Sequence, residues 1–321
     1  MNDLTLNQLF ENIKFRKTKS ILKDHKKPIV IAGSGPSLER INYQRLPNDF
    51  LSFRINNFFL EEKYFLGKNV DFCYQSMGRH ETIYTLLNTI TNYDYNFRNN
   101  FFFTSDIVSK TFPKYNFFPR VEIEKILSKD LKMSSYLAEV YFYQKKIVTS
   151  GILSLLTTIA LGFKNIYLVG IDFYSDKEKR YGYKIGENYR KVVGKEDLVS
   201  GYTERFHSRE IDLKGLEIAL SYKDVSIKSI CDDAFINNFI ELAPITREDS
   251  YRVIKKDKHS ISDYIVPPLV LEKNLTEKKN KKNNPGLLKQ TLIEFKNTLL
   301  VKFLYDFLIK PIFVIPVKFI V

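Results

Sequence analysis

Short apolar runs recur along the middle of this 321-residue chain, and several of them end in glycine or uncharged polar residues. The run over 29–32, Ile-Val-Ile-Ala, is followed directly by Gly-Ser-Gly-Pro-Ser, which cannot continue a strand. Apolar runs this short, rich in β-branched and aromatic residues, predict strands. Five more strands are expected, over 50–58, 70–76, 100–105, 165–174 and 225–230.

Segments with the spacing of a helix lie between these runs. The strongest is 149–163, a buried helix for which Thr149 or Ser150 is the expected N-cap and Gly162 the expected end. Strands that alternate with helices predict an α/β fold, in which helices cover both faces of a mostly parallel sheet. Other helical stretches are expected over 37–42, 77–93 and 209–222.

Residues 175–206 break this alternation, because they are polar and rich in Lys, Tyr and Gly. A loop of this length inside a compact domain is uncommon unless it has a function or is disordered. It directly follows a predicted strand, and open α/β sheets bind their ligands at the carboxyl ends of the strands. We therefore expect 175–206 to form a lid over an active site.

The two ends of the chain differ from its middle. The formal net charge is +13, and much of the excess lies in 15–27 and 277–284. Apolar residues then recur at helical spacing from Leu288 to Phe303, opposite polar ones. A basic amphipathic helix indicates binding to an anionic membrane surface; packing on the core or in an oligomer interface is the alternative. The expected parts are a basic extension (1–27), one α/β domain (28–270) and a membrane-associating tail (271–321).

Composition excludes several other classes of protein. No zinc-finger, RNP or repeat motif accompanies the positive charge, so we expect no nucleic-acid partner. Residues 1–27 hold no secretory signal, and no stretch reaches the roughly 18 apolar residues of a spanning helix. Cys73 and Cys231 fit no disulfide or metal pattern. The expected location is therefore the cytoplasmic side of the membrane.

The loop after the first strand matches part of a nucleotide-binding motif. Gly33 and Gly35 fit G-x-G, but Leu38 stands where G-x-G-x-x-G has its third glycine. A dinucleotide site is therefore poorly supported, and no G-x-x-x-x-G-K-[ST] phosphate loop is present in the sequence. Taken alone, this stretch is either a ligand-binding loop or a tight turn.

Uncharged polar residues follow the other predicted strands or open the helix over 149–163. Their side chains suit a base or a sugar, and the amides at a helix N-terminus can bind an anion. Each alone is more often a cap or a turn, but together at one sheet edge they predict a nucleotide site. They are Asn56, Asn57, Gln75, Ser76, Thr149, Ser150 and Gly151.

Asp172 is a lone acid at a point where metal-dependent nucleotide-sugar transferases usually have paired carboxylates. We therefore expect metal-independent chemistry, or a donor with a single phosphate. The hydroxyls of Tyr174, Tyr181 and Tyr183 can stabilise that phosphate; the alternative for any one lid tyrosine is a hydrophobic plug.

His207 ends the predicted lid and precedes a helix for which Ser208 is the expected cap. A histidine in this place can take a proton from a hydroxyl near neutral pH. A surface or capping role is the alternative.

Segments in order from Pro28 to Pro244 carry a resemblance to a known family. They read IVIAGSGPSLERINYQRLPNDF, FRINNFFLEEKYFLGK, TSG followed by IALGFKNIYLVGIDFY, HSREIDLKGLE and NFIELAP. The chain resembles the bacterial lipooligosaccharide sialyltransferases of glycosyltransferase family 42.

This resemblance implies a single Rossmann-like domain with a lid and an inverting, metal-independent transfer of sialic acid from CMP-sialic acid. No cofactor beyond this donor substrate is expected. The implied acceptor is a galactose or sialic acid hydroxyl of a lipooligosaccharide. The resemblance also implies a homotetramer. The lack of a secretory signal and the basic amphipathic tail predict a peripheral location at the cytoplasmic face of the bacterial inner membrane.

The resemblance assigns roles to particular residues. It implies His207 as the base and Tyr174 and Tyr181 as the phosphate-binding tyrosines. Donor contacts are expected from Gly33, Ser34, Gly35, Asn56, Gln75, Ser76, Thr149, Ser150, Gly151 and Asp172.

Three departures from the family pattern bear on the sugar and the linkage. Ser34 replaces the asparagine of G-N-G-P-S-L, and Gln75 or Ser76 stands where an asparagine is expected. The arginine before T-S-G is replaced by the region 145–148, Lys-Lys-Ile-Val, with one residue inserted. The α2,3 and α2,8 linkages both stay open. Another CMP-activated nonulosonic acid, or an inactive glycan-binding module, are the alternative functions.

Overall fold

The computed structural model describes the α/β region of the chain in several segments. They are 26–76, 85–86, 88–90, 94–98, 102–105, 120–176, 181–183, 207–248 and 251–257. All of them belong to the first of two compact units, Met1–Ile265, and the second unit is Val266–Val321. Most of the N-terminal extension, most of the predicted lid, most of the helix expected over 77–93 and the tail lie outside the described residues, so their boundaries stay predictions.

The centre of the fold is an eight-stranded sheet in which every neighbouring pair is parallel. The prediction of an α/β fold with a mostly parallel sheet is confirmed. The spatial order is β11-β10-β9-β1-β2-β5-β7-β8. The strands are β1 (Ile29–Ala32), β2 (Leu51–Ile55), β5 (Phe72–Tyr74), β7 (Phe102–Thr104), β8 (Arg120–Glu122), β9 (Asn165–Val169), β10 (Ser226–Ser229) and β11 (Glu241–Leu242).

Strand β1 lies in the middle of the sheet, and all four of its residues are fully buried. It pairs with β2 on one side, Ile29 opposite Leu51, and with β9 on the other, Ile29 opposite Ile166. The chain builds the sheet outward from β1 in one direction and then continues from β9 in the other. The carboxyl ends of β1 and β9 therefore form the topological switch point, where α/β sheets bind ligands.

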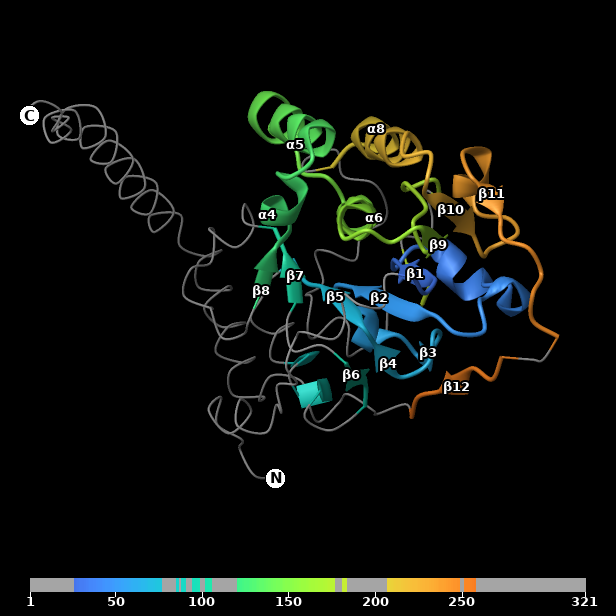
Figure 1. The fold of residues 1–321 in the computed structure, drawn as a ribbon. Helices are drawn as coiled ribbons and strands as arrows, with labels where there is room; N and C mark the ends of the chain where they lie inside the picture. Colours follow the sequence, from blue (N-terminus) through green and yellow to red (C-terminus); the bar gives the residue numbers. More distant parts are fainter. Residues whose placement is uncertain are drawn as a thin grey trace, which may run out of the picture. The chain divides into compact units, whose positions relative to one another are not determined.

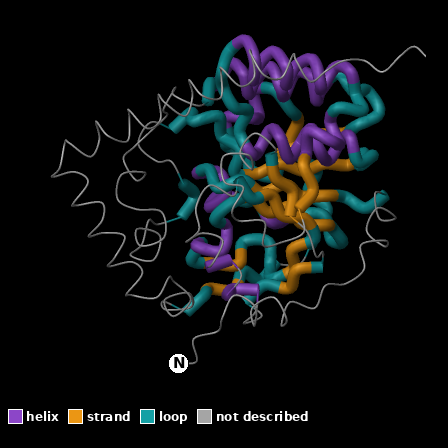
Figure 2. Tube along the Cα trace, turned by 90° about the vertical axis from the view of Figure 1, so that its left-hand side faces the viewer, coloured by secondary structure: helices purple, strands orange, loops and turns teal. Residues whose placement is uncertain are grey.

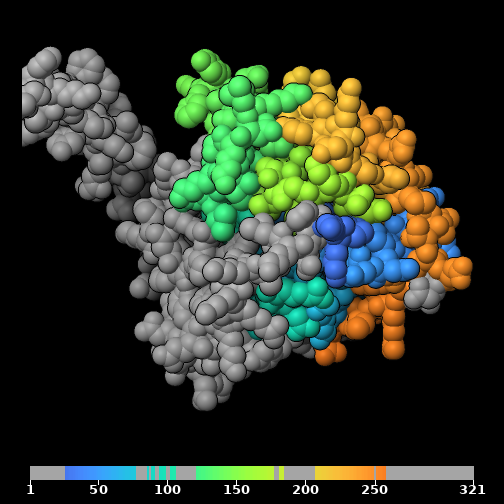
Figure 3. Space-filling view, in the orientation of Figure 1, coloured from blue at the N-terminus to red at the C-terminus, as the bar shows by residue number. Residues whose placement is uncertain are grey.

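Four α-helices have described bounds: α4 (Ile123–Leu127), α5 (Leu131–Ala138), α6 (Ser150–Ala160) and α8 (Arg209–Leu220). Residues 85–86 and 88–90, within the stretch predicted over 77–93, are also helical. Helix α6 packs on β1 and β2, and α4 and α8 pack on α6. Figure 1 shows these helices on one side of the sheet, and Figure 2 shows the same arrangement after a quarter turn. Helices α5 and α8 adjoin at the surface, as the space-filling view shows (Figure 3).

Helix α6 forms where the sequence predicts it. Thr149 is its N-cap, and eight of its residues are buried, from Ile152 through Ile159. Gly162 lies just past its end with φ +92°, a conformation that glycine adopts without the Cβ clash of other residues. A chain with helical propensity and little polar surface on any side forms a helix that is buried all round.

A π-helix, η6 (Glu139–Tyr143), continues directly from α5, and the apolar pattern does not predict it. The wide turn closes with a hydrogen bond from the Gln144 amide to the Glu139 carbonyl, 3.1 Å, and the Lys146 amide then donates to the Val140 carbonyl, also at 3.1 Å. Lys145 has φ +53°, which turns the chain toward the start of α6. The segment before Thr149 is thus an irregular connection, and π turns of this kind often accompany functional sites.

Several predicted elements are shorter in the structure than the apolar runs suggest. The strand expected over 165–174 ends at Val169, because the next residue, Gly170, has φ +66°. The helical stretch over 37–42 is the 3-10 helix η2 (Pro36–Arg40). The run over 70–76 contains two strands, β4 (Asn69–Val70) and β5.

Further short elements lie around the main sheet. They are the 3-10 helices η3 (Tyr43–Arg45), η4 (Phe58–Leu60) and η8 (Phe235–Asn238), and the strands β3 (Lys63–Tyr64), β6 (Asn96–Phe97) and β12 (Ile254–Lys255). Strand β12 pairs with β3 in antiparallel fashion, and β4 pairs with β6 in parallel. Within the described segments, no helix has the length and apolar character needed to cross a bilayer.

Candidate active site

The backbones of β1 and β9 touch at the switch point. The Gly33 amide donates to the Val169 carbonyl, and the Gly35 amide donates to the Gly170 carbonyl, both at 2.9 Å. A Cβ added at Gly33 would lie 2.1 Å from the Gly170 oxygen, so no side chain fits there. Because the two loops are this close, their glycines are required for the shape of the site.

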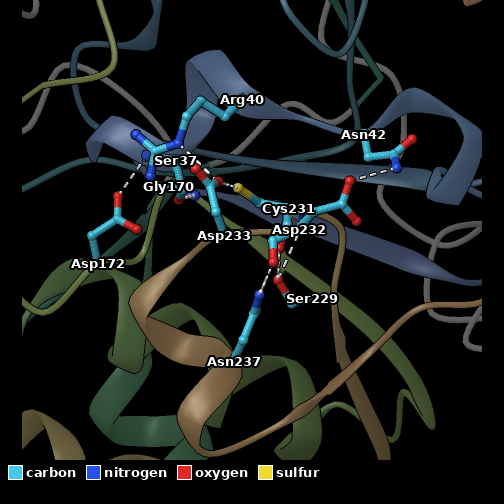
Figure 4. A network of polar contacts seen from close by, with 10 residues as sticks. All are labelled: Ser37, Arg40, Asn42, Gly170, Asp172, Ser229, Cys231, Asp232, Asp233 and Asn237. Atoms are coloured by element: carbon cyan, nitrogen blue, oxygen red, sulfur yellow. Dashed lines mark hydrogen bonds and ion pairs between the residues drawn. The ribbon is translucent and has the colours of Figure 1, made fainter.

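Asp172 and Ser37 connect the same two loops through side chains. The Ser37 amide donates to Asp172 Oδ2, and the Gly170 amide donates to Ser37 Oγ, both at 2.9 Å (Figure 4). Burial raises the pKa of the Asp172 carboxyl. Hydrogen bonds from the Ser37 amide and the Ser37 side chain partly offset this rise. Asp172 therefore holds the glycine loop (33–37) in place through Ser37. Its predicted contact with the donor stays a prediction.

The residues after β10 support the glycine loop from the other side (Figure 4). Arg40 Nε donates to Asp233 at 2.9 Å, and Asn42 Nδ2 donates to Asp232 at 2.7 Å. The Cys231 thiol donates to Asp233 at 3.2 Å, and burial raises its pKa to about 11. Cys231 is a buried structural thiol, in agreement with its lack of a disulfide or metal pattern in the sequence.

Asn56 joins the ends of β2 and β5 to the start of α6. Its Nδ2 donates to Ser150 Oγ at 3.0 Å, and its Oδ1 accepts from the Ser76 amide at 3.1 Å. The Gln75 side chain is buried and donates to the Asn56 carbonyl at 2.5 Å. Asn56 has φ +51°, a conformation that asparagine tolerates better than most residues. Three predicted site residues thus meet at Asn56.

The described part of the predicted lid lies on the glycine loop. The Gly182 amide donates to the Ser34 carbonyl at 2.9 Å. A Cβ added at Gly182 would lie 2.5 Å from the Gly35 carbonyl oxygen, so this contact also requires glycine. The rings of Tyr181 and Tyr183 stack beside it, with centroids 5.5 Å apart. Tyr181 directly precedes the residue that bonds to Ser34, and its predicted contact with the phosphate stays a prediction.

His207 is half-buried, and its Nδ1 lies 2.8 Å from the Ile147 carbonyl oxygen. A carbonyl can only accept a hydrogen bond, so Nδ1 is the nitrogen that carries the proton in a neutral ring. The lone pair of the neutral imidazole is then on Nε2. The His207 and Tyr174 rings lie at 22° to each other, with centroids 6.4 Å apart. The predicted base and one predicted phosphate ligand are thus neighbours.

The first turn of α8 contributes two residues that the sequence analysis did not single out. Arg209 donates to the carbonyls of Phe173 and Tyr174, at 2.9 and 2.7 Å. Asp212 accepts from the Thr149 amide at 3.0 Å, and its side chain is almost fully buried. This turn therefore contacts both the loop after β9 and the start of α6.

Burial raises the pKa of Asp212 to about 7, although the hydrogen bonds from Thr149 favour the ionised form. In the unfolded chain an aspartate titrates near pH 4, so the folded protein binds this proton more tightly. The contribution of this group to stability is therefore complete below about pH 4 and is lost as the pH rises to about 7.

Replacing Asp212 with asparagine removes this titration, while the amide oxygen can still accept from Thr149. Relative to the wild type, the variant should gain stability as the pH rises, by about 1.4 kcal/mol per pH unit between about pH 5 and pH 7. Urea unfolding across this range measures the difference. A difference that does not change with pH would contradict the assignment.

The predicted site residues of the described segments form one connected set at the carboxyl edge of the sheet. The loop after β1, Asn56, the start of α6, the loop after β9, residues 181–183 and His207 are linked by the contacts above. In the segments that the structure describes, no group of three or more His, Cys, Asp or Glu side chains could hold a metal ion. The arrangement offers hydroxyl, amide and imidazole groups to a ligand.

The fold is Rossmann-like, and the predicted site residues gather at its switch point, where folds of this kind bind their ligands. The family model described as alpha-2,3-sialyltransferase (CST-I) matches residues 27–311. The chain therefore belongs to this sialyltransferase family, and the predicted family is confirmed.

Solved structures agree with this family. Monofunctional α-2,3-sialyltransferase Cst-I of Campylobacter jejuni is 28% identical with a TM-score of 0.67, covering 83% of this chain and 98% of its own. Sialyltransferase CstII of the same organism, in complex with the substrate analogue CMP-3FNeuAc, is 30% identical with a TM-score of 0.63, covering 72% of this chain and 92% of its own. The predicted enzyme class, a CMP-sialic acid-dependent sialyltransferase, is confirmed by the family and these neighbours.

A curated relative, an uncharacterized protein of Haemophilus influenzae, is 27% identical over 150 residues. The match covers 46% of this chain and 64% of that protein. It adds no function beyond that of the family.

Proposed function

We propose that this protein transfers sialic acid from CMP-sialic acid to a terminal galactose hydroxyl of a surface glycolipid, in an α2,3 linkage and with inversion at the anomeric carbon. The observation that carries the proposal is the hydrogen bond between His207 Nδ1 and the Ile147 carbonyl. With the proton on Nδ1, Nε2 is the basic nitrogen of the neutral ring, and this ring lies beside that of Tyr174. The family description supports the linkage.

In the proposed reaction, His207 takes the proton of the acceptor hydroxyl as its oxygen bonds to the anomeric carbon. The bond between that carbon and the phosphate oxygen breaks, and CMP leaves with the electron pair. The developing charge on the single phosphate is stabilised by hydroxyl donors from Tyr174 and Tyr181 and by the N-terminus of α6. Neutral donors suffice for one phosphodiester charge, and Asp172, a lone carboxylate, is occupied with Ser37.

The experiment is an assay of CMP release from CMP-sialic acid with a lactoside acceptor, followed by linkage analysis of the product. Release of CMP together with an α2,3-linked product supports the proposal. Turnover only with another CMP-activated nonulosonic acid would show that this sugar, and not sialic acid, is the one transferred. Glycan binding without turnover of any donor would favour an inactive binding module.

We also propose that residues 271–321 hold the enzyme at the cytoplasmic face of the bacterial inner membrane, as a peripheral protein. The support is the basic, amphipathic pattern of this segment, which lies outside the described residues. Deleting 285–321 should move the protein from the membrane pellet to the supernatant of lysed cells. An unchanged distribution would contradict a membrane role. The implied homotetramer is likewise a proposal, which sedimentation analysis of the full chain would test.

A further inference from the structure

The loop after β9 adopts a costly backbone conformation next to the proposed base. Phe173 and Tyr174 are consecutive non-glycine residues with φ +52° and +53°. Side chains of L-residues clash with the backbone in this left-handed region, so such conformations persist when the surroundings impose them. Strained backbone of this kind is often found at functional sites.

Arg209 is one of the groups that impose this conformation. Its Nε donates to the Phe173 carbonyl at 2.9 Å, and its Nη2 donates to the Tyr174 carbonyl at 2.7 Å. The planar guanidinium presents two donors in a fixed geometry, which matches two carbonyls that point the same way. The guanidinium also lies over the Phe235 ring, 5.6 Å from its centroid.

Packing also holds the Phe173 side chain in place. Phe173 is buried, with ring centroids 6.1 Å from Phe235 and 6.3 Å from Phe239. Arg209 and Phe173 therefore share Phe235 as a neighbour. The strained turn is fixed by an apolar contact at Phe173 and by a charged contact at both carbonyls.

We propose that Arg209 is a positioning residue that sets the Tyr174 ring for its contact with the phosphate of the donor. Arg209 follows His207 by two residues in the same chain segment, so one segment places both the base and the turn that carries Tyr174. This inference rests on the proposed function, because it assumes that Tyr174 contacts the donor.

The test is a double-mutant cycle on CMP binding, measured by calorimetry with the full chain. Arg209→Ala should raise the Kd of CMP roughly 30-fold, the effect expected when one charge-assisted hydrogen bond to the ligand is lost. In the Tyr174→Phe background, the same change should raise Kd by less than about 3-fold, because Arg209 acts through Tyr174. Equal effects in both backgrounds would overturn the inference.

Two further variants separate positioning from a general loss of folding. Arg209→Lys retains the charge without the two-pronged geometry, and it should recover part of the affinity, as should guanidinium added to Arg209→Ala. An irreversibly misfolded fraction lowers the number of binding sites and leaves Kd unchanged, and urea unfolding of each variant shows whether reversible unfolding contributes to the apparent Kd. Failure of both the lysine variant and guanidinium to improve Kd over that of Arg209→Ala would overturn the inference.

Arg247 provides a matched control. It donates to the backbone carbonyls of Leu46, Pro47 and Asn48, at 3.3, 3.1 and 3.2 Å, and lies over the Tyr251 ring. These carbonyls directly precede β2. They therefore lie near the amino-terminal ends of the strands, whereas the site lies at the carboxyl-terminal ends. Arg247→Ala should leave the Kd of CMP unchanged; a rise equal to that of Arg209→Ala would count against a role specific to Arg209.

The cycle is independent of turnover, so it separates this inference from the proposed function. Wild-type protein that binds CMP but transfers no sugar would contradict the proposed function, while the coupling between Arg209 and Tyr174 could still be measured. An active wild type with additive effects of the two variants would contradict this inference alone.

Discussion

Replacing His207 with alanine is expected to lower kcat for CMP release by about 10²–10⁴-fold, with a small change in the KM of the donor. The physical reason is the hydrogen bond of Nδ1 to the Ile147 carbonyl, which makes Nε2 the basic nitrogen of the neutral ring. Without a base, the hydroxyl must attack while it still carries its proton. The measurement is CMP release with a lactoside acceptor at saturating donor.

His207→Asn is the matched control for this prediction. The asparagine amide can donate to the Ile147 carbonyl, as Nδ1 does, but it cannot take a proton at neutral pH. Both variants should therefore lose activity to a similar degree, and the asparagine variant should retain the wild-type melting temperature. A rate equal to that of the wild type in either variant would disprove the role as base.

Replacing Gly33 with alanine is expected to destabilise the protein by at least about 3 kcal/mol and to abolish CMP binding. The added Cβ would lie 2.1 Å from the Gly170 oxygen and 2.8 Å from the Gly170 carbonyl carbon. Both atoms belong to the backbone of Gly170, which directly follows β9, so a side-chain rotation cannot relieve the clash. The ends of β1 and β9 must separate, and the glycine loop then loses its shape. Urea unfolding and calorimetry measure the two effects.

Gly162→Ala separates crowding from backbone strain. Gly162 has φ +92°, but a Cβ there would meet no atom within 4 Å. The change should lower the free energy of unfolding by about 1–2 kcal/mol, because alanine is strained in a left-handed conformation. It should leave CMP binding intact. Equal losses in the two variants would show that the close approach of Gly33 to Gly170 is not what matters.

The pattern of apolar runs predicts the centre of the fold well and its periphery poorly. Strands β1, β9 and β10 and helices α6 and α8 lie within their predicted runs. Strand β1 and helix α6 are buried and nearly continuous in apolar character, and α8 has the regular apolar spacing of an amphipathic helix. Strand β8 and helix α4 were not predicted. They have three and five residues, too few for a period of two or of 3.6 to be recognised.

The candidate site could be predicted where its chemistry lies in loops. The glycine loop and Asn56 follow predicted strands, and His207 ends the polar lid directly before a predicted helix, so their positions relative to predicted elements are visible in the sequence. Arg209 and Asp212 lie in the first turn of an amphipathic helix, where charged residues usually face solvent. One signal was available: Asp212 falls on the same helical stripe as Gly215, Leu216 and Ala219, all of which are buried.

The π-helix η6 has a consequence for the length of the chain before α6. One residue inserted into a regular α-helix rotates everything after it by about 100° around the helix axis. The resemblance to the family predicts one inserted residue in the region 145–148, and the π turn over Glu139–Tyr143 lies upstream of it. A turn that is one residue wider would take up such an insertion locally. Ser150 and the amide of Thr149 can thus keep their places at Asn56 and Asp212 while the connection before them changes length.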